Sequence, residues 1–327
     1  MEKTDLKIRA AYAECRKLAC RHYENFPVAS RLVPRAKRDA LAAIYAFARG
    51  ADDFADEPNV AARLAHLAEW GSKLRTCVAG EPAAAGEPGA AFPPVAANPP
   101  DEAGPVFLAL GDTIRRFALS EEHFKNLLRA FESDVRQSRH PNFDSLVAYS
   151  SCSANPVGRL VLELFGHRDT RLFKLSDSIC TALQLTNFWQ DVRVDLARDR
   201  VYLPMEDLAR FGVSLDELRE GRLDGRWRRL MALEVRRTRE LFERGRSLPE
   251  KVVRELRRQL RLTWLGGATI LDRIEAADFD VFNRRPKLTR LDFARLYWRA
   301  RRALEPLPGG AQAQTERSSR AHETRAN

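Results

Sequence analysis

The sequence predicts an all-α protein, and three observations support this class. Apolar residues recur at helical spacing along the chain, runs with strand-like alternation are absent, and no alternation of strands with helices appears. Of the 327 residues, 44% are hydrophobic and 31% are charged, a balance typical of a soluble globular protein. A chain of this length can bury a substantial core. We therefore expect a single helical domain over residues 1–305.

The first helices follow from apolar spacing and from the prolines that interrupt it. One helix is expected at 5–24, a second from Pro34 to just before Pro58, and a third at 60–78. Residues 80–105 contain seven of the seventeen prolines and too few periodic apolar residues to pack. This segment is predicted to be a flexible loop inside the domain.

Helical spacing resumes after this loop and continues to the end of the domain. Ser120 is expected to cap a helix that carries Glu121 and Glu122 in its first turn. In 153–166 the apolar positions, among them Val157, share one face, which predicts core packing. The polar segment 306–327 is predicted to be a disordered tail. The expected helices are 106–117, 121–138, one starting at Asp144, 171–198 and 288–304.

Four polar side chains in the helix predicted at 171–198 form an oxygen stripe, defined as Gln184, Asn187, Asp191 and Asp195. Their spacings of 3, 4 and 4 place them on one helix face. Carboxylate and amide oxygens are the ligands that hard divalent cations prefer. A solvated helix face is the alternative, and it is weakened by the surrounding apolar residues, which are Leu183, Leu185, Phe188, Trp189 and Val192.

A second group of acids, the first acidic cluster, is Asp52, Asp53 and Asp56 in the stretch YAFARGADDFADE. Arg49 precedes Asp52 by three residues, so Arg49, Asp52 and Asp56 can share a helix face, with Tyr45 one turn earlier. Neighbouring carboxylates repel one another unless cations are present. Two such groups can close around a magnesium diphosphate, because Mg²⁺ commonly combines carboxylates with phosphate oxygens.

These two stretches resemble the aspartate-rich motifs of the squalene/phytoene synthase family. The resemblance rests on DDFAD and NFWQDVRVDLARDRVYLP and covers residues 10–303. Four further segments are similar to the hydroxysqualene synthase branch of that family: HYENFPVASRLVP, SANPVGRLVLELFG, RLTWLGG and FDVFNRRP.

The resemblance implies an isoprenoid synthase-type fold in which two aspartate-rich helices face each other across a central apolar cavity. It implies a carbon–oxygen lyase of squalene and hopanoid biosynthesis that ionises presqualene diphosphate with Mg²⁺. Water then quenches the cation to hydroxysqualene, and no NADPH is expected. The implied metal ligands are Asp52, Asp53, Asp56, Asn187, Asp191 and Asp195. The implied substrate and catalytic contacts are His22, Tyr23, Asn25, Tyr45, Arg49, Val157, Gln184, Arg200 and Tyr202.

Two alternatives stay open at this point. The chain could condense two prenyl diphosphates, as presqualene diphosphate and phytoene synthases do. It could also be a basic helical adaptor for membranes or nucleic acid, because its net charge is +10 and Arg222–Arg261 holds fourteen basic residues against six acids. Interleaved glutamates favour a salt-bridged outer face instead, and no nucleic-acid-binding motif is present, so no nucleic-acid partner is expected.

Cysteine usage and hydropathy predict the compartment. Five scattered cysteines without a CxxC pair are typical of a reducing cytoplasm and of small buried thiols. No run of eighteen apolar residues and no signal-peptide pattern is present. We expect a cytoplasmic enzyme, and the resemblance allows peripheral association with the inner face of the membrane and contact with other enzymes of the squalene pathway.

Overall fold

The computed structural model describes residues 2–21, 33–55, 60–79 and 103–307. These residues form α-helices and no strand, with one isolated bridge between Arg139 and Val201, so the all-α prediction is confirmed. The helices are α1 (Glu2–Arg21), α2 (Arg35–Ala55), α3 (Val60–Ala79), α4 (Ala103–Phe117), α5 (Glu121–Arg136), α6 (Phe143–Ser153), α7 (Asn155–Leu164), α8 (Thr170–Leu196), α9 (Met205–Phe211), α10 (Leu215–Glu220), α11 (Gly225–Gly245), α12 (Leu248–Lys251), α13 (Arg254–Ala276) and α14 (Arg290–Arg299).

The chain divides into two compact units. Unit 1 is Met1–Ser138 with Ser151–Asp169, and unit 2 is Arg139–Ser150 with Thr170–Asn327. The first acidic cluster lies in unit 1 and the oxygen stripe lies in unit 2. The single domain over 1–305 stays a prediction, as does the facing arrangement of the two acidic helices.

The core of unit 1 holds α2 in place through aromatic packing. Phe47 is fully buried, and its ring meets those of Phe107 and Phe124 edge-on, with centroids 6.1 and 5.4 Å away. The Trp70 indole donates to the Phe47 carbonyl at 3.2 Å. A Cβ at Gly50 would lie 2.6 Å from Trp70 Cζ2, so this close approach of α3 to α2 requires glycine. One face of α2 is thereby buried while the acidic face stays accessible.

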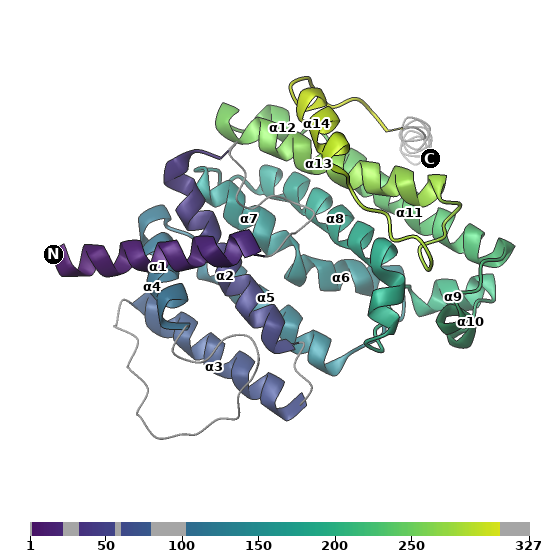
Figure 1. Cartoon of the computed structure of the whole chain (residues 1–327), viewed down its shortest axis with the longest axis horizontal. Coiled ribbons are helices and arrows are strands. Elements are labelled where there is room, and N and C mark those ends of the chain that lie inside the picture. Colours follow the sequence, from purple (N-terminus) through teal and green to yellow (C-terminus); the bar gives the residue numbers. More distant parts are fainter. Residues whose placement is uncertain (1, 22–32, 56–59, 80–102, 308–327) are drawn as a thin grey trace, which may run out of the picture. The chain divides into compact units, whose positions relative to one another are not determined.

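The core of unit 2 is built around α8, which packs against α11 and α13 (Figure 1). Trp189 is fully buried, and its indole donates to the Thr238 hydroxyl at 2.8 Å. A Cβ at Gly267 would lie 2.4 Å from Phe242 Cζ and 2.7 Å from Leu183 Cδ2. The glycine of the RLTWLGG segment therefore lets α13 approach both α8 and α11.

Side-chain caps define where helices of unit 2 begin. Asp224 caps α11 because its Oδ1 accepts from the backbone N–H groups of Arg226 and Trp227 at 2.8 and 3.1 Å. Thr289 and Asp292 form a capping box at the start of α14. These bonds satisfy backbone donors that a helix N-terminus otherwise leaves free.

Three local predictions are corrected by the structure. α4 begins at Ala103, inside the segment predicted as a loop, because Pro105 fits the first helical turn, where its missing N–H costs nothing. Ser120 occupies the N-cap of α5, but its side chain makes no cap bond, and its backbone N–H donates to Glu163 Oε2 at 2.9 Å instead. In α7, Leu160 and Leu164 are buried as predicted, whereas Val157 is 40% exposed.

The ion pairing predicted for the arginine-rich stretch is confirmed at three glutamates. Glu240, Glu243 and Glu250 form ion pairs with Arg244, Arg246 and Arg261 at 3.8, 3.0 and 2.6 Å respectively.

Glu234 also lies 3.2 Å from Arg237 Nη1, but it is fully buried, whereas the sequence predicts it on an outer face.

Helix hydropathy and cysteine burial bear on two further predictions. Within the described ranges, every helix is too short or too polar to cross a membrane. All five cysteines are free thiols. Cys15 and Cys77 are buried as predicted, and burial raises the pKa of Cys77 to about 11, whereas Cys20 is exposed.

Candidate functional site

In unit 1 the first acidic cluster carries its own counter-ion. Arg49 donates through Nη2 to Asp53 Oδ1 at 2.6 Å, and its Nη1 lies 3.3 Å from Asp52 Oδ2. Burial opposes the charge of Arg49, but the two carboxylates outweigh it and raise the guanidinium pKa. The spacing of three and four residues along α2 produces both contacts, which reduces the repulsion expected between neighbouring carboxylates.

Arg49 has a further hydrogen-bond donor, its Nε group, besides the two Nη groups. Its Nε is buried and has no hydrogen-bond partner within the described part of the chain. A buried unpaired N–H is costly unless a ligand or water meets it. This nitrogen is therefore suited to an oxyanion that arrives beside Asp52 and Asp53.

In unit 2 the oxygen stripe lies along one side of α8, and apolar residues fill the other side. Leu185, Phe188, Trp189 and Val192 are buried, as the sequence predicted. Gln184, Asn187, Asp191 and Asp195 are all half-buried, as is Leu183. The stripe is thus held by a packed helix and remains accessible.

The segment that follows α13 closes over the middle of this stripe. Arg285 donates to both oxygens of Asp191, with Nη2 2.9 Å from Oδ2. The hydrogen bond to Asp191 raises the pKa of Arg285, burial opposes it, and the charge of Asp195 adds to the increase. This contact joins residues 94 positions apart in the sequence.

Two neighbouring contacts hold the same segment in register. The Gln190 amide donates to the Pro286 carbonyl, and Arg193 Nη1 donates to the Phe282 carbonyl at 2.9 Å. The matched segment FDVFNRRP therefore meets α8 at three successive polar positions. Its Arg285 guanidinium is placed at Asp191 by these backbone contacts.

The R-x-Y-L-P continuation of the second motif folds back beside the end of α8. The Arg200 backbone N–H donates to the Asp195 carbonyl at 2.9 Å. Tyr202 stacks on Phe188 with ring centroids 3.7 Å apart and an interplanar angle of 8°. The ring centroid of Tyr149 lies 6.0 Å from that of Tyr202. Asp195, Arg200 and Tyr202 line a hollow of about 10 Å³. This is about the room needed by one water molecule.

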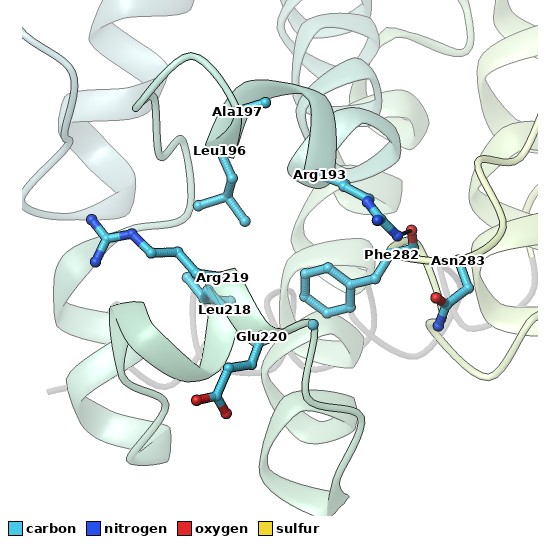
Figure 2. Close-up of a pocket in the computed structure, with 9 residues that line it drawn as sticks. Arg193, Leu196, Ala197, Leu218, Arg219, Glu220, Phe282 and Asn283 are labelled. Carbon is cyan, nitrogen blue, oxygen red and sulfur yellow. Dashed lines mark hydrogen bonds between the residues drawn. The ribbon is translucent and has the colours of Figure 1, made fainter.

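A larger hollow of about 300 Å³ adjoins the end of α8 on unit 2. Figure 2 shows Leu196, Leu218 and Phe282 around it, with Arg193 reaching the Phe282 carbonyl. None of the four oxygen-stripe residues lines it. The central apolar cavity between the acidic helices remains a prediction.

The donor set of the two groups fits magnesium and diphosphate. Within the described ranges, no three His, Cys, Asp or Glu residues gather into a metal site. In each unit the acids are carboxylates one turn or less apart, joined in unit 2 by the Asn187 amide, which suits a hard cation. Each unit also adds an arginine, Arg49 or Arg285, that can pair with an anion.

His22, Tyr23, Asn25 and Asp56 lie outside the described residues. Tyr45 is half-buried on α2, one turn before Arg49.

The sequence analysis does not single out Arg285, whose contact with Asp191 appears only in the structure. Arg285 belongs to FDVFNRRP, one of the segments similar to the family.

Comparison with known proteins identifies the relatives. The family model described as Squalene/phytoene synthase matches residues 19–292. Phytoene synthase from Arthrospira platensis and 15-cis-phytoene synthase from Synechococcus elongatus are 30% and 32% identical, each over 84% of this chain and 87% of the relative. The crystal structure of squalene synthase HpnC from Alicyclobacillus acidocaldarius is 39% identical, covers 84% of this chain and 96% of its own, and has a TM-score of 0.73. A dehydrosqualene synthase structure, 21% identical, shares the fold with a TM-score of 0.78 over 91% of this chain and 98% of its own.

Proposed function

The chain belongs to the squalene/phytoene synthase family, enzymes that condense prenyl diphosphates, and from this premise we propose that it converts presqualene diphosphate to hydroxysqualene and diphosphate. The reaction would be Mg²⁺-dependent and serve squalene and hopanoid biosynthesis. The observation that carries the diphosphate chemistry is the oxygen stripe on α8, with Arg285 bound to Asp191. The 39% identity to the squalene synthase HpnC supports a role in squalene formation. The four segments similar to the hydroxysqualene synthase branch support the alcohol as the product.

Six residues are proposed to hold the cation, with carboxylate or amide oxygens from both groups. They are Asp52, Asp53, Asp56, Asn187, Asp191 and Asp195. When bound, Mg²⁺ supplies Lewis-acid neutralisation of the departing diphosphate. Asp191 must exchange its contact with Arg285 to take part, and Asp52 and Asp53 must share theirs with Arg49. Each arginine is then available to the diphosphate.

Further residues are proposed to bind and orient the substrate. Arg49 and Arg200 would pair with diphosphate oxygens, and the buried Nε of Arg49 offers an unused donor. Tyr45 and Tyr202 would donate to the same anion or face the carbocation, because an aromatic ring attracts a cation. Gln184 extends the stripe by one turn, and the exposed Val157 would contact the isoprenoid chain.

The bond changes balance without an oxidant or reductant. The carbon–oxygen bond to diphosphate breaks, and the electron pair leaves with the diphosphate. The carbocation rearranges, a water oxygen bonds to it, and one proton is released. Tyr23, Glu24 and Asn25 are proposed to hold that water, with His22 beside them, because a held water needs about two to four polar partners. NADPH has no place in this sequence of steps.

The second candidate is condensation of two prenyl diphosphates to presqualene diphosphate or phytoene. It is favoured by the 30–32% identity to phytoene synthases over most of both chains. Both reactions begin with the loss of diphosphate, so the acidic groups would serve either. The adaptor alternative is disfavoured because the glutamates of the arginine-rich stretch pair with its arginines.

Cellular context forms part of the proposal. The substrate is a lipid diphosphate, so the enzyme would work in the cytoplasm at the inner face of the membrane as a peripheral protein. Contact with other enzymes of the squalene pathway, and the lack of a nucleic-acid partner, stay predictions.

Product analysis in labelled water tests the proposal. Enzyme and Mg²⁺ are incubated with presqualene diphosphate or farnesyl diphosphate in ¹⁸O-water, with and without NADPH, and Asp191→Asn is the inactive control. An alcohol carrying one labelled oxygen, formed from presqualene diphosphate without NADPH, is the expected result. A hydrocarbon formed from prenyl diphosphates would support the second candidate. Squalene formed only with NADPH would overturn the assignment.

A further inference from the structure

The last helix of unit 2 exposes large apolar side chains. Leu291 and Trp298 on α14 are 71% and 63% exposed, and Tyr297 is 41% exposed. Leu291 and Trp298 are seven residues apart, so they lie two turns apart on one face. Leu296 is buried, and α14 packs against α13 (Figure 1). Large apolar groups left in water on one helix face mark an interaction surface.

Unpaired arginines surround these side chains. Arg290, Arg295, Arg299, Arg301 and Arg302 are exposed, and none forms an ion pair with an acidic residue in the described ranges. The Arg301 guanidinium lies 4.8 Å from the Trp298 ring centroid, and that of Arg258 lies 3.7 Å from the Tyr297 centroid. We name the eight residues that are exposed the α14 patch: Arg290, Leu291, Arg295, Tyr297, Trp298, Arg299, Arg301 and Arg302.

The pairing of charges decides which basic region can attract a partner. Many arginines on α11 and α13 form ion pairs with acidic residues. Arg239, for example, pairs with Asp272 and with Glu275, both at 2.7 Å. The only acid inside α14 is Asp292, which is already bound to Arg273 and to the Thr289 cap. The α14 patch therefore presents net positive charge, although the sequence contains a longer basic stretch elsewhere.

We propose that the α14 patch docks the enzyme on the surface of an anionic lipid bilayer. Aromatic and aliphatic side chains flanked by arginines lie at the boundary between headgroups and acyl chains, with the guanidinium groups at the lipid phosphates. Leu291 and Trp298 would enter this boundary from one helix face. The inference gives a binding surface to the peripheral membrane association that is part of the proposed function. It does not depend on the proposed reaction, because no residue of the α14 patch belongs to the oxygen stripe.

Charge complementarity favours lipid over two other occupants. The chain's own segment 308–327 holds three arginines and two glutamates, so its net charge of +1 does not complement five arginines. A second copy of the chain would set the same arginines against each other, in a protein of net charge +10. An anionic bilayer supplies both the negative charge and the apolar phase that Trp298 and Leu291 need.

Tryptophan fluorescence offers a specific measurement, because the other four tryptophans are at most 5% exposed. Trp298 is therefore the one that acrylamide quenches readily in the full-length protein. Vesicles of phosphatidylglycerol and phosphatidylcholine should protect it from acrylamide, whereas pure phosphatidylcholine vesicles should protect it far less. Raising the salt concentration should weaken the binding, since screening acts over about 8 Å at physiological ionic strength.

Variants locate the binding surface. Arg295→Gln with Arg302→Gln should weaken partitioning to anionic vesicles about 25-fold, at roughly fivefold for each arginine. Trp298→Ala should weaken it on the order of tenfold or more. The matched control is Arg229→Gln with Arg236→Gln, two exposed arginines of α11, which lowers the net charge equally. Circular dichroism checks that each variant is folded.

The results of these binding experiments distinguish an anionic bilayer from a nucleic acid as the partner of the α14 patch. Salt-sensitive vesicle binding that is lost in the α14 variants and kept in the α11 control supports the proposal. No binding to anionic vesicles at low salt, or equal binding by Trp298→Ala and the parent, would overturn it. Protection of Trp298 by an oligonucleotide but not by vesicles would also overturn it and identify a nucleic acid as the partner.

Discussion

Replacing Glu234 by glutamine should stabilise the protein at neutral pH. Glu234 is fully buried in α11, and Arg237 Nη1 lies 3.2 Å from its Oε1. The same Nη1 donates to Asp207 Oδ2 at 2.5 Å, so one cation serves two carboxylates. Burial raises the pKa of Glu234 to about 8, Arg237 opposes this shift, and the nearby Asp207 and Glu206 add to it.

The magnitude follows from the difference in proton binding between the two states. The ordinary pKa of a glutamate is 4.5, so the unfolded chain loses this proton first, while the native state keeps it until pH approaches 8. Between those values the native state binds more protons, and the free energy of unfolding falls as pH rises. The interval from 4.5 to 7, at about 1.4 kcal/mol for each pH unit, corresponds to about 3–4 kcal/mol at pH 7. Glutamine keeps the shape and has no proton to lose.

Urea unfolding followed by circular dichroism between pH 5 and 8 measures this effect. The parent protein should lose stability over that range, and Glu234→Gln should remove most of the loss. Glu240→Gln is the matched control, because Glu240 is on the same helix, partly exposed, and 3.8 Å from Arg244. If the parent and Glu234→Gln followed parallel curves from pH 5 to 8, Glu234 would not be the titrating group.

Three further outcomes are expected. Asp191→Asn should remove most turnover, since weakening a cation ligand costs several kcal/mol in the transition state. It should change stability by no more than about 1 kcal/mol, because its pair with Arg285 is partly exposed; normal turnover at saturating Mg²⁺ would contradict this. Gly267→Ala should destabilise the protein by about 1–3 kcal/mol through overpacking against Phe242. Gly104→Ala, which meets nothing within 4 Å, is the control in thermal unfolding. Deleting residues 82–101 should keep helicity and activity, because loop-closure free energy varies slowly with length; loss of either would make the segment structural.

The sequence by itself determined the features that depend on local spacing. The all-α class follows from the 3.6-residue period, and so does the contrast between the half-buried oxygen stripe and the buried Leu185, Phe188, Trp189 and Val192. The contacts of Arg49 with Asp52 and Asp53, and of Glu240 with Arg244, follow from separations of three and four residues. Such pairs are neighbours on any helix, so they need no knowledge of the tertiary structure.

Only the tertiary structure decided which distant residues meet. The contact of Arg285 with Asp191 spans 94 positions, and no periodicity connects a loop after α13 to the middle of α8. The same limit explains why the burial or exposure of Glu234, Val157 and Trp298 did not follow from the sequence. The sequence predicts Glu234 on an outer face, but it is buried. It predicts Val157 in the core, but Val157 is exposed. Trp298 is also exposed, and the sequence analysis does not single it out. Burial depends on which helix packs on which face, and that packing is set by long-range contacts that sequence spacing does not encode.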